Sequence, residues 1–335
     1  MSKINMISCG GCGANVALSI VEKMKKIPTS KEFPEISYIH MDTSVANKDI
    51  SSQYNAEFFH IKSNSVGDEG KLSGSGALRS KNVSDTLLGI NELLNTNKDI
   101  LKDDTLNVLV ASASGGSGSI ISPLLSKVLI EKDIPFIVLL VGDDSNLTYA
   151  TNTNDTLKTF HSIAVAKDVT IPMFYINNSE MDNDLKKVNS HLAGFIISLS
   201  MFYISNNKDI DFADMSTFLR IDKMRPKLNI PSGVCLLDAV SGDDTKNIDT
   251  ENLIAARVLN STLSTGALNE KHGSIIYNEL ITFLEKGKNL PIIIYSRTGQ
   301  IEHVIDNLEM KISRLDVKMK ADKIDTSADD NGLVL

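Results

Sequence analysis

The chain has 335 residues, a formal net charge of −8 at pH 7, 42% hydrophobic residues and 23% charged residues. This length and apolar content predict a globular protein of about two domains. The negative charge argues against a direct nucleic-acid or membrane-surface binder, because such a binder needs a basic face.

The cysteine content and the hydropathy pattern indicate where the chain works. Three cysteines, an odd number, are typical of a reducing cytoplasm rather than of a disulfide scaffold. The longest apolar run, residues 194–204, is well short of the roughly 20 residues that a helix needs to cross a bilayer. We therefore expect a cytoplasmic protein that has no membrane partner.

The first half of the chain alternates predicted strands and helices. Apolar runs predict strands at residues 3–8, 36–41, 106–111, 136–141 and 173–177. Helical periodicity predicts helices at residues 15–26, 85–94 and 148–166, and another that ends near residue 129. Apolar strands separated by helices are typical of an α/β protein with a parallel, Rossmann-like sheet covered on both faces. Ligands of such sheets bind beyond the carboxyl ends of the strands.

The second half begins with a long helix and then changes pattern. Residues 183–204 predict a buried central helix, and PSGVCLLDAV, SIIYNELITF and PIIIYS are candidate strands around a helix near residues 249–259. This part predicts a second α/β domain. A long helix follows at residues 301–320, and the polar tail at residues 325–335 is expected to be disordered on its own.

Three glycine-rich loops are the main functional signal. Their residues are Gly10, Gly11, Cys12 and Gly13 in the first loop, Gly74 and Gly76 in the second, and Ser114, Gly115, Gly116, Ser117, Gly118 and Ser119 in the third. Glycine allows positive φ and close approach of a ligand, and helix N-termini offer free N–H groups to anions. One such loop can serve a tight turn alone, but three at one sheet edge predict a cradle for a di- or triphosphate.

Other sites remain open from these residues alone. Cys9 and Cys12 could form a redox or metal-binding dithiol, although a zinc site needs about four ligands and the remaining Cys235 is isolated. Asp42 ends the second strand, where Rossmann dehydrogenases place a ribose-binding acid, but it could equally be a turn or helix-cap residue. The Walker GxxxxGK[ST] motif and a GxGxxG motif after the first strand are both absent. A dinucleotide-binding enzyme thus stays an alternative.

Taken in chain order, these motifs resemble those of the tubulin/FtsZ superfamily of GTPases. The first loop is similar to the GQCG of tubulin, and the third is similar to GGGTGSG, with Ser114, Ser117 and Ile120 as departures. The segment DFADM, residues 211–215, resembles the FtsZ catalytic loop NxDFADV, with Asp209 in place of asparagine. The short chain and the acidic tail ending in GLVL look most like phage-encoded tubulins of the PhuZ type.

The resemblance implies a fold, a ligand and a set of roles. It implies a GTP-binding domain at residues 1–182, a central helix at 183–206, a C-terminal activation domain at 207–300, and a C-terminal helix and acidic tail at 301–335. GTP or GDP would lie over the three glycine loops, and Asp42 would lie near Mg2+ and the γ-phosphate. Asn178 and Asn189 would read the guanine, with Leu185 where tubulin has a stacking aromatic residue, and Asn154 matches the ribose side loosely.

The resemblance also implies activity through self-assembly. Asp211 and Asp214 would act as catalytic residues on the nucleotide of the next subunit in a head-to-tail homopolymer, so that hydrolysis depends on assembly. From the residues alone, two carboxylates three apart share a helix face and could polarise one water, although acids also favour helix N-termini. Asp325, Asp329 and Asp330 would let the tail dock on a neighbouring subunit. The filament would position a phage replication compartment or capsids in the infected bacterium; a plasmid-segregation tubulin of the TubZ type is the alternative.

Overall fold

The structure, a computed structural model, describes residues 3–25, 35–61, 83–96, 105–203, 231–241, 253–259, 275–279, 292–297 and 300–329. Within these ranges it contains a ten-stranded sheet with the order β3-β2-β1-β4-β5-β6-β7-β10-β8-β9. The strands are β1 (Lys3–Cys9), β2 (Glu35–Asp42), β3 (Glu57–His60), β4 (Leu106–Ser112), β5 (Phe136–Gly142), β6 (Thr170–Asn177), β7 (Gly233–Ser241), β8 (Leu253–Leu259), β9 (Ile275–Glu279) and β10 (Ile292–Arg297).

The seven strands from β3 to β7 in the sheet order are parallel, as the apolar runs predict. The central strand β1 pairs on both sides, with Met6 opposite Tyr38 of β2 and Val108 of β4. Strands β4 and β5 are buried along almost their whole length. Their unbroken apolar sequences follow from this, because helices cover both faces.

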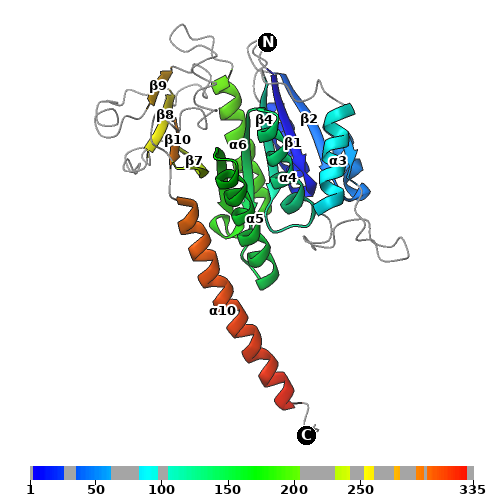
Figure 1. Ribbon diagram of the computed structural model, residues 1–335, viewed down its shortest axis with the longest axis vertical. Coiled ribbons are helices and arrows are strands. Elements are labelled where there is room, and N and C mark those ends of the chain that lie inside the picture. Colours follow the sequence, from blue (N-terminus) through cyan, green and yellow to red (C-terminus); the bar gives the residue numbers. More distant parts are fainter. Residues whose placement is uncertain are drawn as a thin grey trace.

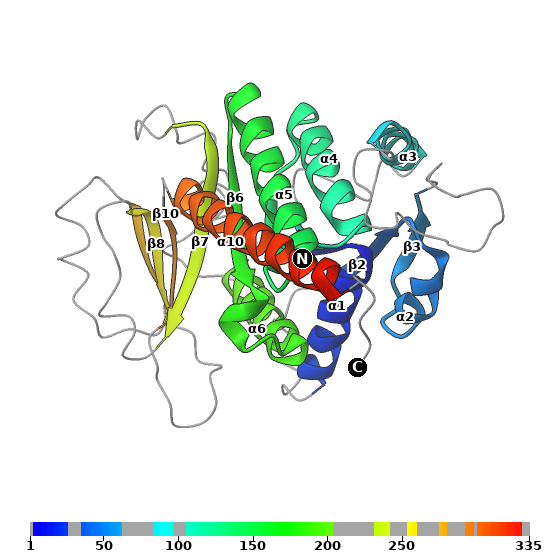
Figure 2. The same ribbon diagram turned by 90° about the horizontal axis from the view of Figure 1, so that it is seen from below.

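Helices lie on both faces of the sheet (Figure 2). They are α1 (Gly10–Met24), α2 (Lys48–Ser52), α3 (Val83–Thr96), α4 (Ser117–Glu131), α5 (Leu147–Ala166), α6 (Leu185–Tyr203) and α10 (Gln300–Asp329), with short 3-10 turns η1 (Val45–Asn47) and η2 (Asn178–Met181). The core is divided accordingly: α1 and α6 contribute to one buried apolar cluster, and α3, α4, α5 and α10 contribute to the other. No helix of the described ranges is both long and apolar enough to cross a bilayer.

The second-half strands continue the same sheet. Strand β7 pairs in parallel with β6, with Thr170 opposite Gly233 and Phe174 opposite Leu237. Strand β10 is antiparallel to both β7 and β8, and β9 is parallel to β8. Helix α10 packs against α5 and β7, and its far end extends away from the body (Figure 1). The domain boundaries implied by the resemblance remain a prediction.

Two sequence expectations were wrong. The helix expected near residues 249–259 is strand β8 from Leu253 to Leu259. Its residues include good helix formers, but pairing with two neighbouring strands outweighs that local preference. The tail expected to be disordered is helical as far as Asp329, because α10 continues through it; residues 330–335 lie outside the described part.

Helix α1 packs unusually close to the strands beneath it. It begins at Gly10 rather than at residue 15, so the first glycine loop is itself the first turn of the helix. A Cβ atom added at Gly13 would lie 2.5 Å from the carbonyl oxygen of Val110 and 2.7 Å from the Cα of Ser8. Since these are backbone atoms of β4 and β1, only glycine fits.

We expect Gly13→Ala to destabilise the protein by about 1–3 kcal/mol, because the new methyl group forces helix and sheet apart. The matched control is Gly194→Ala in α6, where an added Cβ meets nothing within 4 Å. That substitution should stabilise the helix by about 0.5–1 kcal/mol. Urea unfolding of both variants measures the difference, and equal effects at the two positions would contradict this account of the packing.

Candidate functional site

The first and third glycine loops meet at the carboxyl ends of β1 and β4. Gly10 has φ +78°, and a Cβ there would lie 3.1 Å from the backbone nitrogen of Gly118. A Cβ at Gly118 would lie 2.9 Å from the carbonyl oxygens of both Cys9 and Ser112. The two loops are therefore packed backbone against backbone, which places the first turns of α1 and α4 side by side.

The starts of these two helices lack side-chain caps, as does the start of the short helix α2. Neither Cys9 before α1 nor Gly116 before α4 makes a side-chain capping hydrogen bond. By contrast, Asn146 caps α5 by accepting from the backbone nitrogen of Tyr149, and Asn177 caps η2. The first N–H groups of a helix need partners from outside it and carry a partial positive charge. The shared edge of α1 and α4 is thus chemically suited to bind phosphate oxygens.

Hydroxyl and amide side chains fix the third loop. Ser117 Oγ lies 2.6 Å from Thr43 Oγ1, and Asn152 donates from Nδ2 to the carbonyl oxygen of Ser114 at 3.0 Å. Ser119, which the sequence places in the predicted phosphate cradle, is fully buried and donates to the carbonyl oxygen of Gly116 at 3.1 Å. It therefore shapes the loop, while Ser117 lies on the side that faces the end of β2.

Asp42 at the end of β2 joins this group through a dense set of hydrogen bonds. Its side chain is almost fully buried; Oδ2 accepts from Asn47 Nδ2 at 2.6 Å, and Oδ1 accepts from the backbone nitrogen of Ser44 at 3.0 Å. Nε2 of the buried His40 lies 3.5 Å from Oδ2. Asn47 also borders the first loop, since a Cβ at Gly11 would lie 3.2 Å from its Nδ2. The acid is thus a turn residue and also a link between loops.

These contacts set the protonation of Asp42. Burial, the largest influence, raises the pKa of the carboxyl group, but hydrogen bonds from His40, Asn47, Ser117 and the backbone of Ser44 together bring the pKa below its usual value. The group is therefore ionised at neutral pH and stabilised in that form by the fold.

We expect Asp42→Asn to lower the free energy of unfolding by about 1–3 kcal/mol at pH 7, because an amide group would face the donor of Asn47. The folded pKa of Asp42 lies below the unfolded one, so its stabilisation is complete above about pH 4 and is lost as the pH falls through the folded pKa. Urea unfolding at pH 7 and pH 3 should show a smaller difference between wild type and variant at pH 3. The control is Asp155→Asn, at an exposed position of α5, whose free energy of unfolding should stay within about 0.5 kcal/mol of wild type. If the loss of stability in Asp42→Asn were the same at pH 7 and pH 3, the assignment of a lowered pKa to Asp42 would be refuted.

The predicted base-reading residues lie near the carboxyl ends of β5 and β6. Asn178 begins η2, is 6% exposed, and donates from Nδ2 to Asp143 Oδ2 at 3.0 Å. Its Oδ1 is buried and has no hydrogen-bond partner among the described residues, as is also true of Oδ1 of Asn154. Asn154 lies inside helix α5 rather than in a loop. Asn189 is half-buried on α6, and Leu185 at the start of that helix is 60% exposed.

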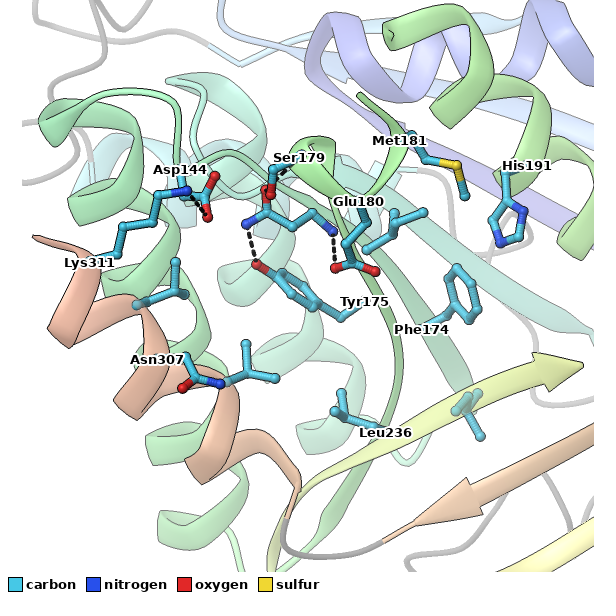
Figure 3. A pocket seen from close by; sticks show the side chains of 15 residues that line it. Asp144, Phe174, Tyr175, Ser179, Glu180, Met181, His191, Leu236, Asn307 and Lys311 are labelled. Carbon is cyan, nitrogen blue, oxygen red and sulfur yellow. Dashed lines mark hydrogen bonds and ion pairs between the residues drawn. The ribbon is translucent and has the colours of Figure 1, made fainter. Parts of the chain in front are cut away.

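A capping box holds η2 in place beside a cavity of about 480 Å³ (Figure 3). Asn177 Oδ1 accepts from the backbone nitrogen of Ser179, and Glu180 Oε1 accepts from the backbone nitrogen of Asn177 at 2.9 Å. Across the cavity, Lys311 of α10 pairs with Asp144 at 2.7 Å. The neighbouring carboxylates of Asp143 and Asp144 thus face different partners, Asn178 and α10.

Several predicted residues lie outside the described part of the chain. They are Gly74, Gly76, Asp209, Asp211 and Asp214. Conversely, Thr43, Asn47, Asp143 and Asn152 contact the site but were not predicted. The signal available for Asp143 was its place directly after a buried strand, at the edge where ligands bind.

The dithiol interpretation finds little support. All three cysteines are free thiols. Burial raises the pKa of Cys12 to about 12 and, together with the charge of Asp42, raises the pKa of Cys9 further. A reactive or metal-binding cysteine needs its thiolate near neutral pH, which this environment opposes.

Comparison with known proteins places this geometry in context. No family model matches the sequence. Over 155 residues, 46% of this chain, it is 27% identical to the phage tubulin-like protein of Pseudomonas phage 201phi2-1, and the match spans 47% of that protein. The chain thus matches about half the length of this curated relative.

Solved structures agree over almost the whole chain. The PhuZ201 filament matches with a TM-score of 0.69 and 17% identity, covering 95% of this chain and 92% of the other. The phage tubulin PhuZ with GDP matches with the same score and coverage at 18% identity. This chain has the tubulin/FtsZ-like fold. The GTPγS-bound protofilament of CetZ2 from Haloferax volcanii also matches, with a TM-score of 0.67, 17% identity and coverage of 94% and 100%. The expected fold class and the resemblance to phage tubulins are confirmed.

Proposed function

We propose that this tubulin-like chain is a GTPase that assembles into filaments in the cytoplasm of an infected bacterium. The observation that carries the proposal is the contact between two glycine loops that brings the uncapped starts of α1 and α4 to one edge of the sheet. This edge supplies what a nucleotide phosphate chain needs, and the fold is the one on which tubulin-like proteins are built.

The described residues fit a guanine nucleotide in two parts. The phosphates would lie over Gly10–Gly13 and Ser114–Ser119, with the hydroxyl of Ser117 alongside. The base would lie near η2, where Oδ1 of Asn178 is a buried acceptor to which no described residue donates. Leaving such an acceptor unpaired costs about 1–3 kcal/mol, so a base that supplies an N–H group would recover that free energy.

Asp42 fits a role beside a magnesium ion. Among the described residues, no group of three or more histidine, cysteine, aspartate or glutamate side chains could hold a metal. Magnesium in nucleotide sites commonly takes one or two protein ligands and completes its shell with phosphate oxygens and water. Mg2+ would supply charge neutralisation at the γ-phosphate, and Asp42, already ionised, would approach it from the end of β2.

Hydrolysis would be completed by a neighbouring subunit. We assign Asp211 and Asp214 the role of orienting the attacking water against the nucleotide of the next subunit, because phosphoryl transfer depends on positioning and charge stabilisation. A head-to-tail contact uses two different surfaces and forms an open filament when its rotation does not close. Turnover would then require polymer.

Assembly and turnover can be tested together on purified protein. GTP, but not ATP, should raise right-angle light scattering above a threshold protein concentration, and scattering should decay as phosphate appears. Asp211→Ala should form long-lived polymer with phosphate release reduced by a factor of about 100 or more, in line with loss of a positioned catalytic group.

The control for that experiment is Asp155→Ala, which removes an exposed carboxylate from α5 and should assemble and turn over as wild type does. Absence of both scattering and GTP turnover at high protein concentration would refute the proposed function. If the protein bound NAD and showed neither GTP-dependent scattering nor GTP turnover, the alternative of a dinucleotide-binding enzyme would be favoured.

The C-terminal segment is proposed to strengthen filament contacts. Helix α10 reaches Asp329 and projects from the body (Figure 1), so it carries the acidic residues Asp325 and Asp329 away from their own subunit. Charge steering and burial of the apolar tip would favour docking on a neighbour.

Deleting residues 325–335 should raise the critical concentration for assembly several-fold, because longitudinal contacts lose the docked tail. Light scattering against protein concentration measures the threshold. Deleting residues 330–335 alone, which leaves α10 as described, separates the tip from the helix end; unchanged thresholds in both truncations would exclude docking.

The cellular role we favour is to position the phage replication compartment or capsids. The alternative is that the protein segregates a plasmid or prophage, as a tubulin of the TubZ type would. That class usually has a longer chain with a basic tail for its DNA adaptor, and the tail here is acidic.

A further inference from the structure

Asp143, which no motif assigns, lies directly after β5 and is fixed by four hydrogen bonds. Its backbone nitrogen donates to Thr153 Oγ1 at 3.1 Å, and Thr153 Oγ1 donates to its carbonyl oxygen at 3.0 Å. Its carboxylate Oδ1 accepts from the backbone nitrogen of Ser145 at 2.9 Å, and Oδ2 accepts from Asn178 Nδ2 at 3.0 Å. Each carboxylate oxygen therefore accepts a hydrogen bond from a defined donor.

This arrangement decides how the amide of Asn178 is turned. An ionised carboxylate only accepts hydrogen bonds, so the NH2 group of the amide must face Asp143. The amide oxygen is then the group left for a ligand, and it is the buried Oδ1 that no described residue pairs. The backbone of Asn178 is held at the same time by the capping box of Asn177 and Glu180.

We infer that Asp143 is a positioning residue that gives the site its preference for guanine. This inference rests on the proposed function. The Watson–Crick edge of guanine has two donor groups, N1–H and N2–H2, whereas N1 of adenine is an acceptor. If the amide oxygen of Asn178 points toward the base, it accepts a hydrogen bond from the N–H groups of guanine. The same oxygen repels the N1 acceptor of adenine. Asp143 produces this selectivity through Asn178.

The substitution Asp143→Asn should reverse the orientation of the Asn178 amide, so that its NH2 group rather than its oxygen faces the base. The backbone N–H of Ser145 still needs an acceptor, so the new amide keeps its oxygen there and turns its NH2 toward Asn178. Asn178 must then rotate to accept from it, and its own NH2 faces the base. The affinity for GDP should fall about 10- to 100-fold relative to that for ADP, as expected when one buried hydrogen bond is replaced by a mismatch.

The measurement is displacement of a fluorescent GDP analogue by GDP or ADP, because the diphosphates allow binding to be measured without assembly. The matched control is Asp144→Asn, which makes the same charge change in the adjacent residue, whose partner is Lys311 of α10. It should leave the GDP/ADP affinity ratio unchanged. A general loosening of the loop would lower both affinities alike, so the ratio separates a positioning role from a structural one.

Two guanine analogues test the orientation in the wild-type chain, independently of how the variant folds. IDP lacks the N2 amino group, and 1-methylguanosine diphosphate lacks N1–H. At least one should bind about 10-fold or more weakly than GDP if Asn178 presents its oxygen. Equal affinity for GDP and both analogues, or an unchanged GDP/ADP ratio in Asp143→Asn, would overturn the inference. Absence of GDP binding to wild type would instead refute the proposed function.

Discussion

The close contact between the loops that follow β1 and β4 is the constraint on which the site depends. Gly10 and Gly118 touch through their backbones, and Gly13 places α1 directly on the two strands. Side chains at these positions would separate the helices from each other or from the sheet. With glycine, the N-terminal ends of α1 and α4 converge on one edge, where neither helix start has a side-chain cap and the helix dipoles favour an anion.

The polar residues around that surface are held by one another rather than by solvent. Asp42 is ionised although it is buried, because donors from three segments face it. The low dielectric of the interior strengthens the hydrogen bonds of such a network, but it also makes any polar group without a partner costly. Among the described residues, the buried polar atoms without a hydrogen-bond partner include Oδ1 of Asn154 and Oδ1 of Asn178, and both lie where the proposed nucleotide would be. Unfilled hydrogen-bond capacity at a ligand site couples binding to stability, because a ligand that binds only the folded state stabilises it.

The parts of the fold set by local pattern could be predicted from the sequence. Apolar runs identify β1, β4 and β5, and the first and third glycine loops follow β1 and β4 at the edge where a parallel sheet binds ligands. Strand β8 could not be identified this way, since the Leu253–Leu259 segment suits a helix until its two partner strands are considered. Asn47 and Thr43 were missed for a related reason. Their roles arise from contacts made across the fold, such as the 2.6 Å approach of Thr43 to Ser117, which no local spacing encodes.

Continuity of the sheet connects the two halves of the chain at η2, beside the proposed position of the base. Strand β6 ends in the capping box of η2 and pairs in parallel with β7, which in turn pairs with β10. The β5–α5 loop adds a second connection, since Asp143 contacts η2 while Asp144 contacts α10. A displacement of α10 or β7 therefore acts on elements that also hold Asn178. Packed elements move as units rather than deforming smoothly. Under the proposed function, contacts made by the second half with another subunit would therefore reach the nucleotide through β6 and this loop.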